Sequence, residues 1–96
     1  MSITVSQTAT QPKLEFAVVV REGRGETRHT VTLDPALLTR LAGARGVDGE
    51  TFVQAVFEFL LEREPKESIL SRFDVSVVAR YFPEFESEIG NYLGTD

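Results

Sequence analysis

The segment from Phe52 to Leu61 is apolar on almost every side of the helix that it is expected to form. Its polar positions, Gln54 and Glu58, form only a narrow stripe that Glu62 continues just after the segment. A helix of this kind has to be covered nearly all round, so it lies at the centre of a core or between subunits. Asp48 can cap its start and Pro65 prevents its continuation, which predicts a helix that ends at about Arg63. We therefore expect the rest of the chain to pack around this helix.

Two alternating runs earlier in the chain predict a β-hairpin over residues 14–33. Side-chain parity and charge favour one register, which pairs Phe16 with Val31, Val18 with His29 and Arg21 with Glu26. That register leaves Gly23 and Arg24 as a two-residue loop, with glycine at the first position as a type II′ turn requires. The hairpin would therefore have one apolar face and one outer face.

The remaining segments predict further helices. Asp34 and Pro35 are suited to begin one, and Gly43 is suited to end it. Farther on, one short helical piece is expected over residues 68–73, another after Asp74, and a last helix is expected to begin at Pro83. These C-terminal pieces are expected to bury several large side chains, namely Tyr81, Phe82, Phe85, Ile89 and Leu93. The predicted fold class is α+β, a β-hairpin followed by three or four helices packed on one face.

The length of 96 residues is enough for a single domain with one modest core. Residues 1–12 are rich in Ser, Thr and Gln, and we interpret them as a flexible N-terminal tail in which Ile3 and Val5 could add a short edge strand. Residues 13–96 are then expected to form the single α+β domain.

Composition and charge narrow the possible functions. The chain has no cysteine, which excludes disulfides, thiolate nucleophiles and cysteine-based zinc sites. This absence, together with an N-terminus that has no basic start and no apolar run, favours a cytoplasmic location. The net charge of −5 is uneven, because residues 1–46 carry six basic and four acidic side chains and residues 47–96 carry four and eleven. The acidic half should repel nucleic acid and anionic membranes, so neither is an expected partner.

The most basic part of the predicted hairpin is its tip, where Arg21, Arg24 and Arg28 could contact an anion or an acidic partner. Because Glu22 and Glu26 lie between them, a solvated turn with ion pairs is the alternative interpretation. His29, which is the sole histidine, points to the apolar face and is interpreted as structural rather than catalytic. There is no Gly-x-Ser-x-Gly elbow and no His/Cys cluster, so we expect no enzyme activity, cofactor or metal.

The outer face of the hairpin carries a set of small and apolar side chains, Ala17, Val19, Thr30 and Thr32. A two-stranded sheet is not easily covered by helices on both sides, so this face is a possible interface. A two-fold homodimer is the expected assembly. The predicted function is that of a small non-enzymatic binding or regulatory module that acts through protein–protein contacts.

Two stretches resemble known families. The stretch FEFLLEREPKESILSRFDVSVVARYFPEFESEI, from Phe57 to Ile89, resembles small bacterial proteins of unknown function. The stretch HTVTLDPALLTRLAGARGVDGETFVQAVFEFLLE, from His29 to Glu62, resembles the ribbon-helix-helix family of DNA-binding dimers. That second resemblance implies a strand that pairs with its dimer mate and reads base edges through Thr30 and Thr32, with Arg28 beside them. The alternative function is thus a ribbon-helix-helix-like DNA-binding regulator or antitoxin.

Overall fold

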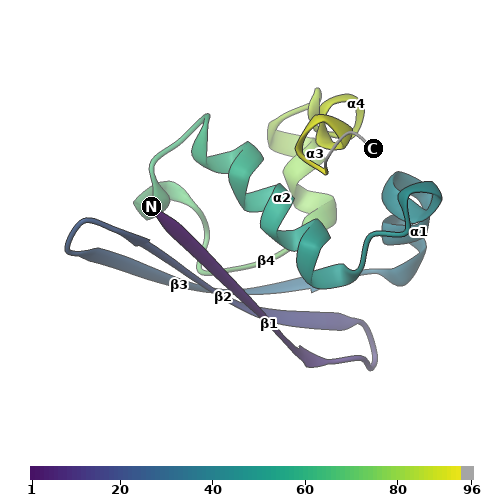
Figure 1. The fold of residues 1–96 in the computed structure, drawn as a ribbon, viewed down its shortest axis with the longest axis horizontal. Coiled ribbons are helices and arrows are strands. Elements are labelled where there is room, and N and C mark those ends of the chain that lie inside the picture. The colour runs from purple at the N-terminus through teal and green to yellow at the C-terminus, as the bar shows by residue number, and fades with distance from the viewer. Residues whose placement is uncertain (94–96) are drawn as a thin grey trace.

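The computed structural model describes residues 1–93, and within them the chain forms one four-stranded sheet with its helices on one face (Figure 1). The strands are β1 (Ser2–Ala9), β2 (Leu14–Glu22), β3 (Gly25–Leu33) and β4 (Arg72–Asp74). The α-helices are α1 (Pro35–Ala42), α2 (Gly49–Leu61), α3 (Val78–Tyr81) and α4 (Phe85–Glu88). Short 3₁₀ turns lie at Gly43–Arg45, Lys66–Ser68, Val75–Val77 and Ile89–Tyr92. Residues 94–96 of the predicted domain lie outside the described range.

The fold class is α+β, as predicted, but the order of its elements differs from a hairpin followed by helices. The strand order is β1-β2-β3-β4, so the predicted hairpin of β2 and β3 is the middle of a larger sheet. Strand β1 precedes the hairpin and pairs antiparallel with β2. Strand β4 follows α2 in the chain and pairs parallel with β3. The helices α1 and α2 therefore form the connection between two parallel neighbours.

Strand β1 comes from the segment that was interpreted as a flexible tail in which Ile3 and Val5 could add a short edge strand, and it spans Ser2–Ala9. Its alternation is weak in sequence because it contains only two large apolar residues, Ile3 and Val5, which pack against the core. Ser2, Thr4 and Ser6 point to the opposite face, beside the outer residues of β2. Two apolar positions are enough here because this edge strand has only one covered face.

The helical piece that was expected over residues 68–73 is not formed, because a 3₁₀ turn ends at Ser68 and strand β4 begins at Arg72. Its central residue, Phe73, is buried opposite Val31. Its last residue, Asp74, accepts hydrogen bonds from the Thr32 hydroxyl at 2.6 Å and from Lys13 at 3.0 Å. Partial burial raises the pKa of Asp74, but hydrogen bonds from Thr32, Ser76 and Lys13 outweigh it and hold the pKa at about 2. The hydrogen bonds of the charged Asp74 side chain thus help to hold this short strand against β3.

The predicted hairpin register is confirmed. Phe16 pairs with Val31, Val18 with His29, and Arg21 with Glu26. The loop is Gly23-Arg24, in which Gly23 has a φ of +60°, and no non-glycine residue in the described range has a positive φ. Together these values fit the type II′ turn.

The predicted helix starts are also confirmed. The Asp34 carboxylate accepts from the backbone N–H of Ala36 at 2.9 Å and caps α1. The Asp48 carboxylate accepts from the N–H of Thr51 at 2.8 Å and caps α2. Asp74 in turn caps the 3₁₀ turn that leads into α3, through the N–H of Ser76.

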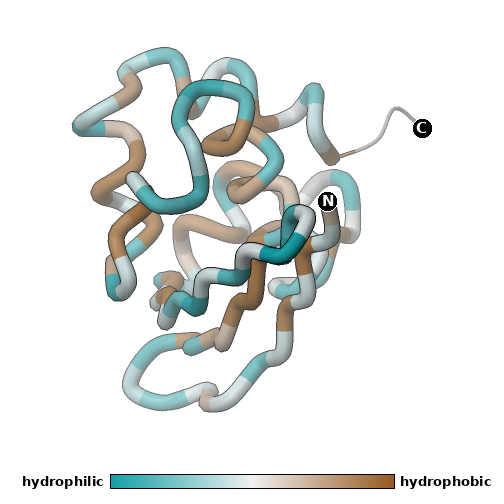
Figure 2. The backbone as a smooth tube through the Cα atoms, turned by 90° about the vertical axis from the view of Figure 1, so that its left-hand side faces the viewer, coloured by the Kyte–Doolittle hydropathy of each residue, from teal (hydrophilic) through white to brown (hydrophobic). Residues whose placement is uncertain are grey.

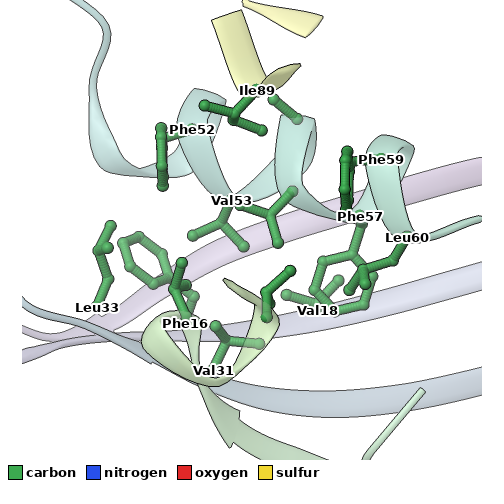
Figure 3. Close-up of a cluster of buried hydrophobic side chains, with 14 of the residues drawn as sticks. Phe16, Val18, Val31, Leu33, Phe52, Val53, Phe57, Phe59, Leu60 and Ile89 are labelled. Carbon is green, nitrogen blue, oxygen red and sulfur yellow. The ribbon is translucent and has the colours of Figure 1, made fainter. Parts of the chain in front are cut away.

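Helix α2 lies at the centre of the core, as its sequence predicts (Figure 3). Its side chains Val53 and Phe57 point toward the sheet, and Phe52 and Phe59 lie on the side that meets the C-terminal turns. All four are fully buried. A Cβ atom at Gly49 would lie 2.7 Å from the Phe16 ring, so any other residue at the start of α2 would require that ring to move.

The C-terminal segment is fastened to α2 by a group of side chains that we call the clasp, formed by Phe59, Arg63, Glu84, Glu88 and Tyr92. Arg63 pairs with Glu84 at 3.0 Å and with Glu88 at 2.9 Å, and it donates to the Phe59 carbonyl at 3.0 Å. Its guanidinium carbon lies 3.6 Å from the centre of the Phe59 ring. Hydrogen bonding to Tyr92 and Glu84 raises the pKa of Arg63, although burial opposes it.

The hydrophobic residues concentrate in the middle of the molecule and the hydrophilic ones on its loops (Figure 2). Among residues 1–93, no helix has the length and apolar character that crossing a membrane requires.

Candidate functional site

A groove of about 430 Å³ opens between the C-terminal end of α2, the loop before β4, and α3. Its walls are mostly apolar and are formed by Leu60, Leu70, Phe73, Val77, Val78 and Phe82. Three polar side chains also line it, namely Glu64, Ser68 and Tyr81. A concave apolar surface with a few polar groups is the usual form of a binding site.

Two large side chains stand at the rim of this groove with much of their surface in solvent. Leu70 is 52 % exposed and Tyr81 is 69 % exposed. The sequence predicted Tyr81 to be buried, and this prediction is wrong. Helix α3 ends at Tyr81, and the chain then turns at Phe82 and Pro83 toward α4, so no element of the described residues covers the ring. Exposed apolar side chains around a concavity are typical of a contact surface.

Glu64 supplies a carboxylate to the groove. It follows the last turn of α2, where its backbone N–H donates to the Leu60 carbonyl at 2.9 Å. Within residues 1–93 its side chain has no hydrogen bond or ion pair. Burial beside the apolar walls raises the pKa of this carboxyl. A partly desolvated anion of this kind gains energy from any cation that a ligand brings.

The wall that carries Leu70 is held in place by His29. This histidine is only 4 % exposed and lies on the inner face of β3, as its place in the register predicts. Its Nδ1 donates to the Leu70 carbonyl at 2.8 Å, because a carbonyl oxygen can only accept. Its Nε2 lies 2.9 Å from the Thr27 hydroxyl, and its ring packs 5.2 Å from that of Phe57. Both ring nitrogens are therefore used in the structure, which fits a positioning role.

The predicted basic site at the hairpin tip is largely paired. Arg21 contacts one oxygen of Glu26 at 2.9 Å, and Arg28 contacts the other at 2.8 Å. The hydrogen bond from Arg21 is the main cause of the lowered pKa of Glu26. Arg24 lies apart from this pair, in the exposed turn. The geometry thus resembles the solvated turn with ion pairs that was the alternative interpretation.

The predicted interface residues do share the uncovered face of the sheet. Ala17 is exposed, while Val19, Thr30 and Thr32 are partly buried by their neighbours. Strand β1 adds Thr4 and Ser6 to this face, and β4 adds charged residues, so the face is more polar than a hairpin alone would be. Both edges of β3 are occupied, by β2 and by β4. This strand is therefore not free to pair with a dimer mate as the ribbon-helix-helix arrangement requires.

Comparisons of the chain with protein-family models, with curated proteins and with solved structures found no match. The chemistry of the groove is then the best guide to function. In the described part of the chain, no three acidic or histidine side chains gather as metal ligands would. The groove offers apolar walls, two hydroxyls and one carboxylate, which is a set suited to holding an apolar group next to a cation.

Proposed function

We propose that this protein is a non-enzymatic binding module that acts through protein–protein contact and holds its partner in the groove. The observation that carries the proposal is the combination of the exposed Leu70 and Tyr81 with the partly desolvated carboxylate of Glu64. Tyrosine is enriched among the residues that dominate binding energies, particularly where apolar walls exclude water around it. The rim and the floor of the groove therefore support contact with another protein.

The groove also favours a particular partner chemistry. Its volume and apolar walls suit one aliphatic or aromatic side chain as an anchor. A lysine or arginine next to that anchor would pair with Glu64 and remove its desolvation penalty. The second half of the chain is strongly acidic, which favours the approach of a basic segment. We therefore propose a short segment with an apolar anchor and an adjacent basic residue.

DNA binding, which the ribbon-helix-helix resemblance implies, has less support. Of the side chains that would read bases, Arg28 is paired with Glu26 and Thr32 donates to Asp74, which leaves Thr30 between them. Protein binding in the cytoplasm remains the proposal that fits the groove, the charge and the composition together.

Selection from a phage-displayed library of random peptides tests the proposal. Wild-type protein should enrich peptides in which a Leu, Ile, Phe or Trp lies next to Lys or Arg. Affinities of the selected peptides are then measured by isothermal titration calorimetry for the wild type, Glu64→Lys and Tyr81→Ala. Glu58→Lys is the matched control, because Glu58 lies on the polar stripe of α2 and does not line the groove. Circular dichroism verifies that each variant is folded.

Glu64→Lys should weaken the selected peptides at least about tenfold, the value of one charge-assisted contact, while Glu58→Lys leaves them unchanged. A peptide whose basic residue is replaced by Glu should recover binding to Glu64→Lys. The proposal fails if no sequence is enriched, or if the selected peptides bind Glu64→Lys as tightly as the wild type.

A further inference from the structure

Strand β1 forms one edge of the sheet, and between Ser2 and Ser6 it lacks the features that usually protect such an edge. Its pairing with β2 becomes irregular only between Gln7 and Ala9. Over its eight residues, Ser2–Ala9, it contains no charged residue and no proline. Natural edge strands are commonly short, charged or interrupted, because their free backbone groups otherwise pair with another chain. The opposite edge, β4, follows that rule, since it has three residues and two of them are charged.

The hydrogen bonds of the sheet show which backbone groups of β1 point outward. The N–H of Gln7 donates to the Glu50 carboxylate of α2 at 2.9 Å, so it points away from β2. Because backbone direction alternates along a strand, the N–H and C=O groups of Ile3 and Val5 point the same way. The pairing of the other strands gives the same result. The N–H of Thr30 donates to Ser71 of the neighbouring segment at 2.8 Å and so points away from β2, which directs the N–H of its partner Ala17 toward Ser6 of β1. Ser6 therefore bonds to β2, and the residues on either side of it point outward.

Ile3 and Val5 therefore present four backbone groups at the open edge, and nothing in residues 1–93 pairs with them. Each such group gains a hydrogen bond when another strand is added. At Gln7 the edge is closed by Glu50, so the part that can accept a strand ends before that residue.

We propose that β1 pairs antiparallel with β1 of a second copy of this chain, about a two-fold axis at Thr4. In this register Ile3 of each copy lies opposite Val5 of the other, and the two Thr4 residues face each other. All the outward groups of Ile3 and Val5 are used, and the pairing stops before the position that Glu50 occupies. A two-fold axis makes the contact self-complementary, as the commonest homodimers are.

The side chains of β1 match this arrangement on both faces. On the inner face, Ile3 would lie against Val5 of the second copy and extend the apolar layer beneath the helices. On the outer face, Thr4 would meet Thr4, and Ser2 would meet Ser6, which are favourable hydroxyl pairs. The groove lies beside β4 at the other edge, so it stays open in such a dimer.

Disulfide trapping tests the register directly, because the chain has no cysteine of its own. The two Thr4 residues would form a non-hydrogen-bonded pair, with Cα atoms about 4.5 Å apart, which suits a disulfide. Thr4→Cys should therefore form a covalent dimer rapidly under mild oxidation. Ser6→Cys is the matched control, since its two thiols would be about 14 Å apart at 3.4 Å per residue. Equal cross-linking of the two variants would overturn the proposed register.

Sedimentation equilibrium tests the pairing itself. Val5→Pro removes an outward N–H without touching the bonds to β2, whereas Val5→Ala shortens the side chain and keeps that N–H. We expect Val5→Pro to weaken the dimer about 30-fold more than Val5→Ala, which corresponds to two lost hydrogen bonds per dimer. A wild type that stays monomeric at high micromolar concentration overturns the proposal. A dimer that Val19→Lys dissociates and Val5→Pro does not would overturn it in favour of the outer face.

Discussion

Two regions meet at the C-terminal end of α2, the clasp and the groove. Each contains one of two consecutive charged residues, and in the described part of the chain only the residue in the clasp is paired. In the clasp, Arg63 has partners on Glu84, Glu88 and the Phe59 carbonyl. In the groove, the next residue, Glu64, has a partly desolvated side chain with no partner among residues 1–93. The clasp joins two parts of the chain, and the groove leaves a surface open.

The difference teaches how to separate a structural site from a binding site in this fold. Burying a charge costs free energy unless hydrogen bonds and an opposite charge compensate it. The clasp compensates its cation, so it contributes to stability. The groove does not compensate its anion, so Glu64 lowers the stability of the isolated protein and becomes favourable when a cationic partner arrives. The predictions below test this contrast in order of decreasing effect.

The largest effect is expected in the clasp at Phe59. This side chain is fully buried and meets Phe85 and Tyr92 edge-to-face at 5.2 and 5.8 Å. Phe59→Ala should therefore lower the free energy of unfolding by about 3–5 kcal/mol, as for other buried phenylalanines. Urea titration followed by circular dichroism measures it. A loss below about 1 kcal/mol would show that the clasp is not part of the core.

The next effect is expected at Arg63. Arg63→Met keeps most of the packing over Phe59 but leaves Glu84 and Glu88 without their cation. We expect a loss of about 1–3 kcal/mol in the free energy of unfolding, since both carboxylates are partly exposed and remain solvated. The free energy of unfolding of Arg63→Lys should lie between those of Arg63→Met and the wild type, because lysine keeps the positive charge but lacks the planar guanidinium group. Equal stability of Arg63→Met and wild type would remove the contrast between clasp and groove.

Glu64→Gln should raise the free energy of unfolding, whereas the substitutions in the clasp lower it. Burial raises the pKa of Glu64 in the folded state, so the folded protein loses stability, relative to its protonated form, as the pH rises through that pKa. Glutamine mimics the protonated form and should raise the free energy of unfolding at pH 7 by about 0.5 kcal/mol or less. Near pH 3 both forms are neutral and the gain should vanish. Urea titrations at the two pH values test this, and a destabilised Glu64→Gln at pH 7 would show that the carboxylate is structural.

The smallest effect on stability is expected at Tyr81. Its ring is 69 % exposed, so Tyr81→Ala should change the free energy of unfolding by less than about 0.5 kcal/mol. The same substitution should weaken groove-binding peptides at least about tenfold, because a bound peptide would cover the Tyr81 ring and exclude water from it. Calorimetry and urea titration on one preparation provide both values. If Tyr81→Ala changed the free energy of unfolding but not the affinity for peptides, Tyr81 would be a structural residue and not a binding residue.

The sequence predicts those parts of the fold that depend on neighbouring residues. The register of β2 and β3 follows from side-chain parity and the Gly23 turn, and the helix starts follow from Asp34 and Asp48. Each of these features involves residues close together along the chain, whose preferences are known. The centrality of α2 likewise follows from its apolar circumference.

The two outer strands could not be predicted in the same way. Strand β1 is mostly Ser, Thr and Gln, a composition typical of tails, and only the alternation of Ile3 and Val5 hints at a strand. Strand β4 has three residues, too few for a period, and its parallel pairing depends on where the helices place it. The groove was missed for the same reason, since Glu64, Leu70 and Tyr81 come from three segments whose relative positions no local pattern encodes.

The parallel pairing of β4 has a consequence for the order of folding. The hairpin of β2 and β3 closes across two residues, whereas Thr32 meets Asp74 across 42 positions of sequence. Long loops close later and reopen at lower cost, so β4 should be the last strand to dock and the first to detach in native-state hydrogen exchange. The amide proton of Thr30, bonded to Ser71, would then exchange faster than those of the hairpin. Leu70, which lines the groove, directly precedes Ser71, so the amide proton of Thr30 reports on that wall. Its exchange rate measures how often this wall detaches from the sheet.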